Sequence, residues 1–306
     1  MKSNVCSVYA SGMRGVEIVE APAKSVLNRV TGMPFPWSIN PYRGCYHGCV
    51  FCYARRTHTF LEEDGLARWG SRIYVKTNAP AVLRSELAKR SWRHEDVAIG
   101  TVTDPYQPLE GSYRLTRGIL EALADYDTPA SLITRSPHVI RDIDVLRRLA
   151  RVAGASVSVS IATLDPVLAR QIEPTVAAPE KRLLAVRKLA HAGIKVHVAL
   201  APILPHITDS AENVEAVVHA AREAGAHAVW HNTLHLHEVT RDAFFGYLRS
   251  NRPDLIARYA SYYRGKYAPR EVHDAVETRV SSALRRFPKH APPFITPSGP
   301  LQLTLI

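Results

Sequence analysis

Three of the four cysteines in this 306-residue chain stand close together, as Cys45, Cys49 and Cys52. The spacing C-x3-C-x2-C supplies three thiolates from one short loop, and thiolates grouped in this way bind iron–sulfur clusters. If the cluster holds four irons, three protein ligands leave one iron open to a ligand from outside the chain. The motif therefore predicts a metal-cluster loop, and the fold must present that loop at an accessible site.

Other uses of these cysteines have to be weighed. Zinc could be held in a Cys3His site completed by His47 or His58, although common zinc motifs pair two C-x2-C units across a longer gap. Cys6 could serve as a fourth cluster ligand, which would give a plain electron-transfer centre. The first ten residues contain no apolar stretch of the secretory type, so we expect no disulfide framework.

The surrounding sequence narrows the interpretation. Residues 40–55 read NPYRGCYHGCVFCYAR, residues 103–110 read TDPYQPLE, and residues 132–136 read LITRS. Together these motifs resemble the radical S-adenosylmethionine (SAM) superfamily, in the branch related to spore photoproduct lyase and to DNA repair photolyase-like proteins. The resemblance spans residues 23–232, and the cysteine motif is its most specific part.

The resemblance implies a 4Fe–4S cluster on Cys45, Cys49 and Cys52, with S-adenosyl-L-methionine bound to the open iron. Reductive cleavage of that cofactor would yield a 5′-deoxyadenosyl radical that abstracts a hydrogen atom from the substrate. A reductant such as flavodoxin or ferredoxin would supply the electron. Nucleic acid is the candidate substrate partner.

Hydrophobic patterning predicts the fold independently. Short apolar runs alternate with stretches that carry apolar residues at helical spacing, a pattern typical of an α/β chain with a parallel sheet. Expected strands are 38–41, 96–103, 130–134, 156–161, 194–201 and 226–232, and expected helices are 115–126, 142–152, 180–192 and 211–224. In the N-terminal part, a short helix is expected over residues 23–30. Six such units match the partial (β/α)6 TIM-like barrel of the superfamily. We expect an N-terminal extension (1–36), a barrel core (37–235) and a C-terminal helical extension with a tail (236–306).

Barrels of this type carry their chemistry where the strands end. In the resemblance, Asp104 is the candidate contact for the methionyl amino group, with Glu110 second, and Arg135 beside Thr134 is the candidate for the methionyl carboxylate. Ser158 and Ser160 share one face of a strand, and Ser160 is the candidate for the ribose hydroxyls. Phe51 is expected to pack against the adenine.

One departure from the related lyases concerns the return of a hydrogen atom to the product. The resemblance implies a cysteine near the end of the second strand, and residues 100–104 contain none. Tyr106 is the nearest alternative donor in the sequence. His231, His235 and His237 follow the sixth strand, where a histidine-lined substrate cavity is favoured over a second metal.

Charge and composition add broader expectations. A net charge of +11 fits a protein that binds polyanions. Residues 258–270 mix tyrosines with basic residues, and packing of a C-terminal helix is favoured there over base stacking. The proline-rich tail from Pro292 has few apparent anchors. No run of apolar residues is long enough for a membrane span, and free thiols with an oxygen-sensitive cluster point to the cytoplasm.

Three functional hypotheses remain from the sequence. The first is a radical SAM enzyme of the DNA photolesion lyase type, and the second is a radical SAM enzyme acting on tRNA, a peptide or a small metabolite. The third is a non-catalytic zinc or iron–sulfur module that binds nucleic acid.

Overall fold

The computed structural model describes residues 13, 15–61, 64–289 and 291–297, and its largest element is a seven-stranded sheet in the order β10-β9-β8-β7-β6-β3-β2. Six neighbouring strands are parallel: β3 (Trp37–Ile39), β6 (Val97–Ile99), β7 (Ala130–Thr134), β8 (Ala155–Ser160), β9 (Lys195–Ile203) and β10 (Ala228–Thr233). The short β2 (Asn28–Arg29) pairs antiparallel with β3. The six parallel strands follow chain order across the sheet, which confirms the predicted α/β partial barrel. Its two edges, β10 and β2, are not joined in the described residues.

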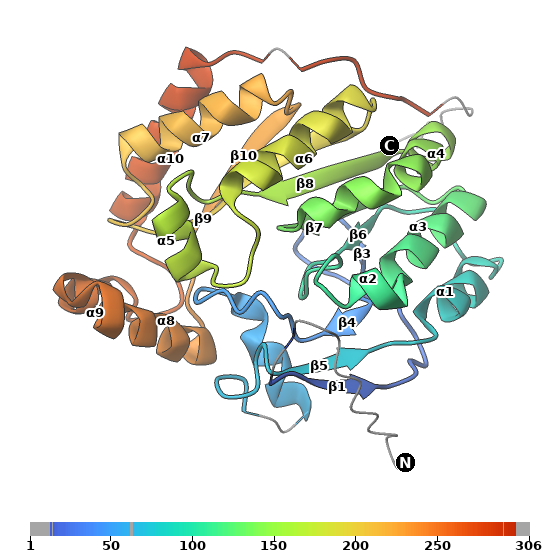
Figure 1. The fold of residues 1–306 in the computed structure, drawn as a ribbon, viewed down its shortest axis with the longest axis horizontal. Helices are drawn as coiled ribbons and strands as arrows, with labels where there is room; N and C mark the ends of the chain where they lie inside the picture. Colours follow the sequence, from blue (N-terminus) through green and yellow to red (C-terminus); the bar gives the residue numbers. More distant parts are fainter. Residues whose placement is uncertain (1–12, 14, 62–63, 290, 298–306) are drawn as a thin grey trace.

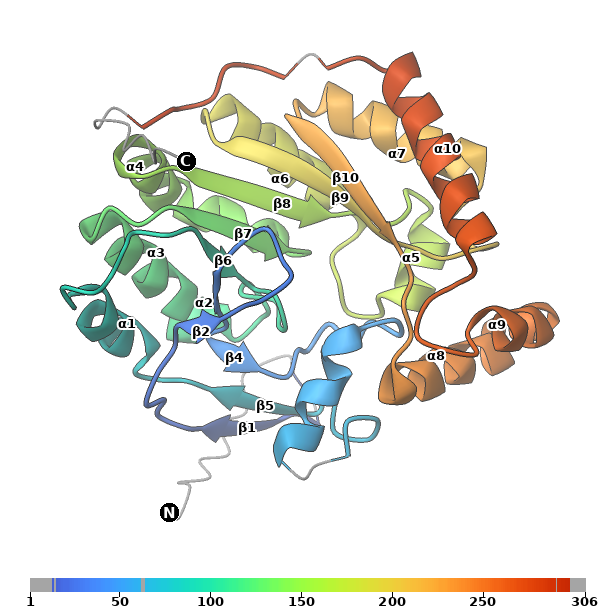
Figure 2. The same ribbon diagram turned by 180° about the vertical axis from the view of Figure 1, so that it is seen from behind.

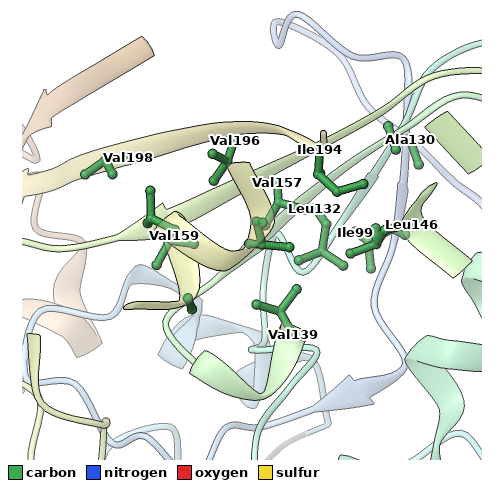
Figure 3. Close-up of a cluster of buried hydrophobic side chains, with 14 of the residues drawn as sticks. Ile99, Ala130, Leu132, Val139, Leu146, Val157, Val159, Ile194, Val196 and Val198 are labelled. Carbon is green, nitrogen blue, oxygen red and sulfur yellow. The ribbon is translucent and has the colours of Figure 1, made fainter. Parts of the chain in front are cut away.

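Helices cover one face of this sheet (Figure 1). They are α1 (Ala79–Leu87), α2 (Glu110–Tyr113), α3 (Leu115–Asp125), α4 (Ile143–Val152), α5 (Pro166–Ile172), α6 (Pro179–His191) and α7 (Ala211–Glu223). The apolar stripes of α1, α3, α4, α6 and α7 meet alternate strand residues in the main core, and Figure 3 shows Leu132, Val157 and Val196 pointing into it. Burial of this large apolar layer is the dominant stabilisation of the fold.

Among the residues that the structure describes, no helix covers the opposite face of strands β7 to β10 (Figure 2). Because side chains alternate along a strand, the residues between the core valines of β8 point to this second face, namely Ser156, Ser158 and Ser160. On β10 the same alternation places Trp230 there. The inner face of the partial barrel is therefore lined mainly by small and polar side chains, and Trp230 and Ile133 are its larger apolar members.

A second, three-stranded sheet supports the cysteine loop. It contains β1 (Glu17–Glu20), β5 (Arg72–Val75) and β4 (Tyr42–Arg43) in the order β1-β5-β4. Short 3-10 helices η1 (Tyr53–Thr57) and η2 (Thr59–Leu61) follow the cysteines, and η3 (Pro137–Asp142) precedes α4. The C-terminal part adds α8 (Glu238–Asn251), η4 (Pro253–Leu255), α9 (Ile256–Tyr262) and α10 (Arg270–Arg286).

Two local expectations were wrong. A short helix over residues 23–30 is absent, because the backbone N–H groups of Val26 and Leu27 donate to the Glu86 carboxylate and β2 pairs with β3. The tail beyond Pro292 is anchored where it is described, since Ile295 N donates to Gly193 O at 2.7 Å. Within residues 258–270 the prediction of packing holds for Tyr259 and Tyr263, which are fully buried, but not for Tyr267, which is 56% exposed. Among the described helices, none has both the length and the apolar character that a membrane crossing requires.

Candidate functional site

The cysteine loop begins directly after β4 with a turn that requires glycine. Gly44 has φ +85°, and a Cβ at this position would lie 2.5 Å from Arg72 O. The turn sends the chain into the segment with the three cysteines, of which Cys45 and Cys49 are buried and Cys52 is partly exposed. The loop then closes into η1 through Cys52 N, which donates to Cys49 O at 3.2 Å.

The segment that follows β6 holds this loop in place. Thr103 Oγ1 donates to Gly44 O at 2.6 Å, and Tyr46 N donates to Gln107 Oε1 at 2.9 Å. From the other side, Arg55 donates to Cys49 O at 3.1 Å. The loop is therefore fixed to the ends of the parallel strands, where active sites of barrel enzymes lie.

The three thiols lie close enough to influence one another's ionisation. Burial raises the pKa of the Cys49 thiol, and the Cys52 and Cys45 thiolates raise it further. Burial and the Cys45 thiolate raise the pKa of Cys52 to about 11. Metal binding requires deprotonated cysteine and releases these protons, so a positively charged metal centre would relieve the repulsion among the thiolates. The donor set fits an iron–sulfur cluster held by three cysteines.

The two histidines considered as zinc ligands differ in their surroundings: His47 lies beside Asp104 and Cys45, and His58 lies against Trp69. Although burial alone would lower the pKa of His47, the Cys45 thiolate and the Asp104 carboxylate raise it to about 10. Its Nδ1 lies 3.3 Å from Asp104 Oδ2, an ion-pair distance without hydrogen-bond geometry. His58 is fully buried, with its ring 5.3 Å from that of Trp69. In the part of the chain that the structure describes, no three His, Cys, Asp or Glu side chains are grouped as ligands of a metal ion.

Asp104 joins the ends of β6 and β7. Its Oδ1 accepts hydrogen bonds from Tyr106 N at 2.8 Å and Thr134 Oγ1 at 2.7 Å, and its Oδ2 accepts one from Arg135 N at 2.7 Å. Burial acts to raise the pKa of this carboxyl, but His47 and these donors lower it. Asp104 is therefore ionised, and about one of its four lone-pair sites remains for another donor.

Arg135 lies between the cysteine loop and the ends of the strands. Its guanidinium lies 5.5 Å from the centre of the Phe51 ring. Nε donates to Glu173 Oε1 at 2.9 Å, and a terminal nitrogen donates to Ala201 O at 3.1 Å. Although burial opposes it, the charges of Cys49 and Glu173 raise the pKa of Arg135. The structure thus brings Arg135 and Phe51 together beside the cysteines.

A buried ion-pair network behind Arg135 was not found from the sequence. Glu173 accepts from Arg135 on one oxygen and pairs with Arg182 at 2.6 Å on the other. Arg182 also donates to Ser160 O at 2.9 Å, so it connects the carboxylate to the end of β8. The sequence did contain a signal for a buried arginine. Arg182 stands at helical spacing from Val186 and Leu189, on the apolar stripe of α6 that faces the core.

Two predicted residues lie away from the cysteines. Tyr106 is fully buried in the main core, where its hydroxyl donates to Asp142 Oδ2 at 2.9 Å. Glu110 accepts hydrogen bonds from Tyr42 Oη at 2.5 Å and from Thr116 N at 3.0 Å at the start of α3. These contacts do not support Tyr106 as a hydrogen donor or Glu110 as a cofactor contact, because both are occupied in the packing of the α3 region.

The histidines after β10 form part of a group of rings beside the cysteine loop. The His235 ring lies 5.6 Å from Tyr53 and 5.8 Å from His237, and 6.1 Å from Tyr267. Tyr53 follows Cys52 directly, and its hydroxyl donates to Thr101 O after β6. His231 pairs instead with Glu277 at 3.2 Å. Cys6 lies outside the described residues.

The site and fold define a class of protein, and comparison with known families agrees. The model of the radical SAM superfamily matches residues 39–214. The chain belongs to the radical SAM superfamily, whose members bind SAM and an iron–sulfur cluster.

Individual relatives can be given for both sequence and structure. An uncharacterized protein of Mycobacterium tuberculosis strain H37Rv is 39% identical over 287 residues, which cover 92% of this chain and 84% of that protein. An uncharacterized protein of Methanocaldococcus jannaschii is 30% identical over 194 residues, or 63% of this chain and 70% of that protein. A spore photoproduct lyase mutant with bound AdoMet and dinucleoside spore photoproduct has a TM-score of 0.68 at 18% identity, covering 88% of this chain and 79% of that one. At this identity the structural match shows a shared fold.

Proposed function

We propose that this protein is a radical SAM enzyme that holds one 4Fe–4S cluster on Cys45, Cys49 and Cys52 and acts on nucleic acid with lyase-type chemistry. The observation that carries the proposal is the loop with three free cysteines, which hydrogen bonds with Thr103 and Gln107 hold at the strand ends of a partial barrel. When bound at the open iron and reduced, SAM supplies a 5′-deoxyadenosyl radical. The net charge of +11 and the fold shared with spore photoproduct lyase favour a nucleic-acid substrate.

The side chains around the loop would bind and orient SAM. Arg135 is held by Glu173 and the Ala201 carbonyl, so a carboxylate group would meet a guanidinium that is already positioned. Asp104 is ionised and retains acceptor capacity for an amino group. Ser160, buried near the end of β8, is the proposed partner of the ribose hydroxyls.

The first experiment asks whether the protein cleaves SAM. Anaerobically reconstituted protein is expected to bind iron and sulfide and to release 5′-deoxyadenosine when dithionite is added. Cys49→Ala should lose both the cluster and the product, because one of three ligands is gone. Cys6→Ala is the matched control and should retain the cluster. Loss of iron in Cys6→Ala, or tightly bound zinc in the native protein, would contradict the proposal.

The substrate is tested separately. Ultraviolet-irradiated duplex DNA is expected to bind more tightly than undamaged duplex or tRNA, and lesion-containing DNA should be consumed in the presence of SAM and reductant. Equal binding of all three nucleic acids, with no lesion consumed, would favour tRNA, a peptide or a small metabolite as the substrate. SAM cleavage in the first experiment would still stand in that case.

A further inference from the structure

The helix-free face of the sheet carries an exposed tryptophan with a fixed orientation. Trp230 is 37% exposed, and its indole Nε1 donates to Ser158 Oγ at 3.2 Å. These two residues stand on β10 and β8, with β9 between them. Neighbouring strands are about 4.8 Å apart, so the indole must extend across β9 to make this bond. One side of the ring is thus turned to the sheet and the other to the open face.

Small side chains around Trp230 leave this face unfilled. Ala199 is paired with Trp230 in the neighbouring strand, and Ser160 is paired with Ala199. In closed barrels, large side chains normally fill the interior at this level. An aromatic ring surrounded by alanine and serine, on a face that no helix covers, is suited to stacking against a flat ligand.

Basic side chains lie at the other end of the same face. Lys195 and His197 are on the strand beside Trp230, and Lys195 lies four residues before Ala199, about 13 Å along β9. Lys289 Nζ lies 3.3 Å from His227 Nε2, and the His227 ring lies 5.8 Å from that of His197. Burial and the charge of Lys195 lower the pKa of His197 to about 4. The two lysines, Lys195 and Lys289, make the local potential positive.

One polar atom in this basic group has no hydrogen-bond partner among the described residues. Nε2 of His197 is buried and makes no hydrogen bond. The C-terminal tail packs against this basic group. The centre of the Phe294 ring lies 4.8 Å from that of the His227 ring and 5.2 Å from Lys195 Nζ. The carboxylate of Asp96 lies at the start of β6, near Ser131 and three strands away from β9. It is therefore too distant to neutralise Lys195.

We propose that this face binds one nucleotide unit of a nucleic-acid substrate, with the base stacked on Trp230 and a phosphate held by Lys195 and Lys289. This inference rests on the proposed function and specifies where the substrate would lie. Charge complementarity selects a nucleotide over an aromatic peptide side chain, because the stacking surface and the lysines share one face. The combination of stacking and backbone charge is typical of single-strand binding.

The test uses reconstituted protein with SAM and without reductant, so that binding is observed apart from turnover. The probe is a short single-stranded oligodeoxynucleotide that carries 2-aminopurine, whose fluorescence is quenched by stacking. Trp230→Ala should weaken binding about 5- to 150-fold and abolish the quenching. Trp230→Phe should retain most of both, since it keeps an aromatic ring. Iron content verifies that each variant is folded.

The phosphate contact is tested by salt dependence. Lys195→Gln should reduce the slope of log affinity against log salt concentration by about one. Lys188→Gln removes the same charge from the exposed side of α6 and should leave the slope unchanged.

Two results would overturn the inference. One is unchanged quenching and affinity in Trp230→Ala, and the other is equal competition by an uncharged aromatic peptide. Either result together with normal SAM cleavage by the native protein would refute this site and leave the radical SAM function intact. Absence of SAM cleavage in the native protein would instead refute the proposed function itself.

Discussion

Arg182 places a full positive charge in the layer between β8 and α6, with 1% of its side chain exposed. The charge is tolerated because Glu173 and the Ser160 carbonyl accept from it. Through Glu173 it also sets the position of Arg135, which contacts Phe51 of the cysteine loop. A residue that contributes nothing directly to the site therefore orients a side chain that does.

Replacing Arg182 with Leu should destabilise the fold by about 3–5 kcal/mol, because it leaves the buried Glu173 with one cation instead of two. Urea unfolding measures the change in the free energy of unfolding. Arg187→Leu, on the exposed side of the same helix, is the matched control and should change stability by less than about 0.5 kcal/mol. Equal effects of the two substitutions would show that the buried Arg182–Glu173 pair does not contribute to the free energy of unfolding more than an exposed arginine does.

Polar residues near a motif proved harder to assign than the motif itself. Asp104 and Glu110 both belong to the segment after β6, yet one bonds Arg135 N beside the site and the other accepts from Thr116 N at the start of α3. Both carboxyls are buried, and neither spacing nor residue type separates them. The distinction depends on which direction the chain turns between Pro105 and Pro108.

The first turn of the cysteine loop tolerates little change at Gly44. Gly44→Ala should destabilise the protein by about 1–3 kcal/mol and lower its iron content, because alanine is strained at φ +85° and its Cβ would meet Arg72 O. Iron analysis and urea unfolding test both effects. The control is Gly111→Ala in α2, where an added Cβ meets nothing within 4 Å. Full iron occupancy in Gly44→Ala would mean that the loop adapts.

Helices in which apolar residues recur at regular helical spacing were predicted well. Segments whose conformation depends on contacts with residues far away in the sequence were not. The helices α3, α4, α6 and α7 bury regular stripes, so their approximate bounds follow from the sequence. Residues 23–30 look equally helical in isolation. Their amide groups, however, bind Glu86 from α1, a partner that no local pattern reveals.

At the scale of the whole molecule, the last described segment spans the starts of the central strands. Ile295 packs against the main core and is bonded to Gly193, just before β9, and Phe294 packs on His227, just before β10. The tail thereby connects the C-terminal extension to the barrel (Figure 2). Its position also forms one end of the inner face.

Ile295→Ser should lower the free energy of unfolding by about 1 kcal/mol, because the half-buried side chain loses its apolar contacts with the core. Thr296→Ser, at the exposed neighbouring position, should leave it unchanged. Thermal or urea unfolding of both variants measures the difference. If the two variants are equally stable, the tail does not contribute to the fold.

The sequence by itself determined the cysteine motif, the family resemblance and the order of the main strands and helices. Each of these is local, since three cysteines within one loop and apolar residues at fixed periods can be read along the chain. Only the tertiary structure decided that Glu173 and Arg182 support Arg135, that Tyr106 belongs to the core, and that Trp230 and Lys195 share an open face. These depend on contacts between segments far apart in the chain, where the direction of a side chain is set by packing and not by its neighbours in sequence.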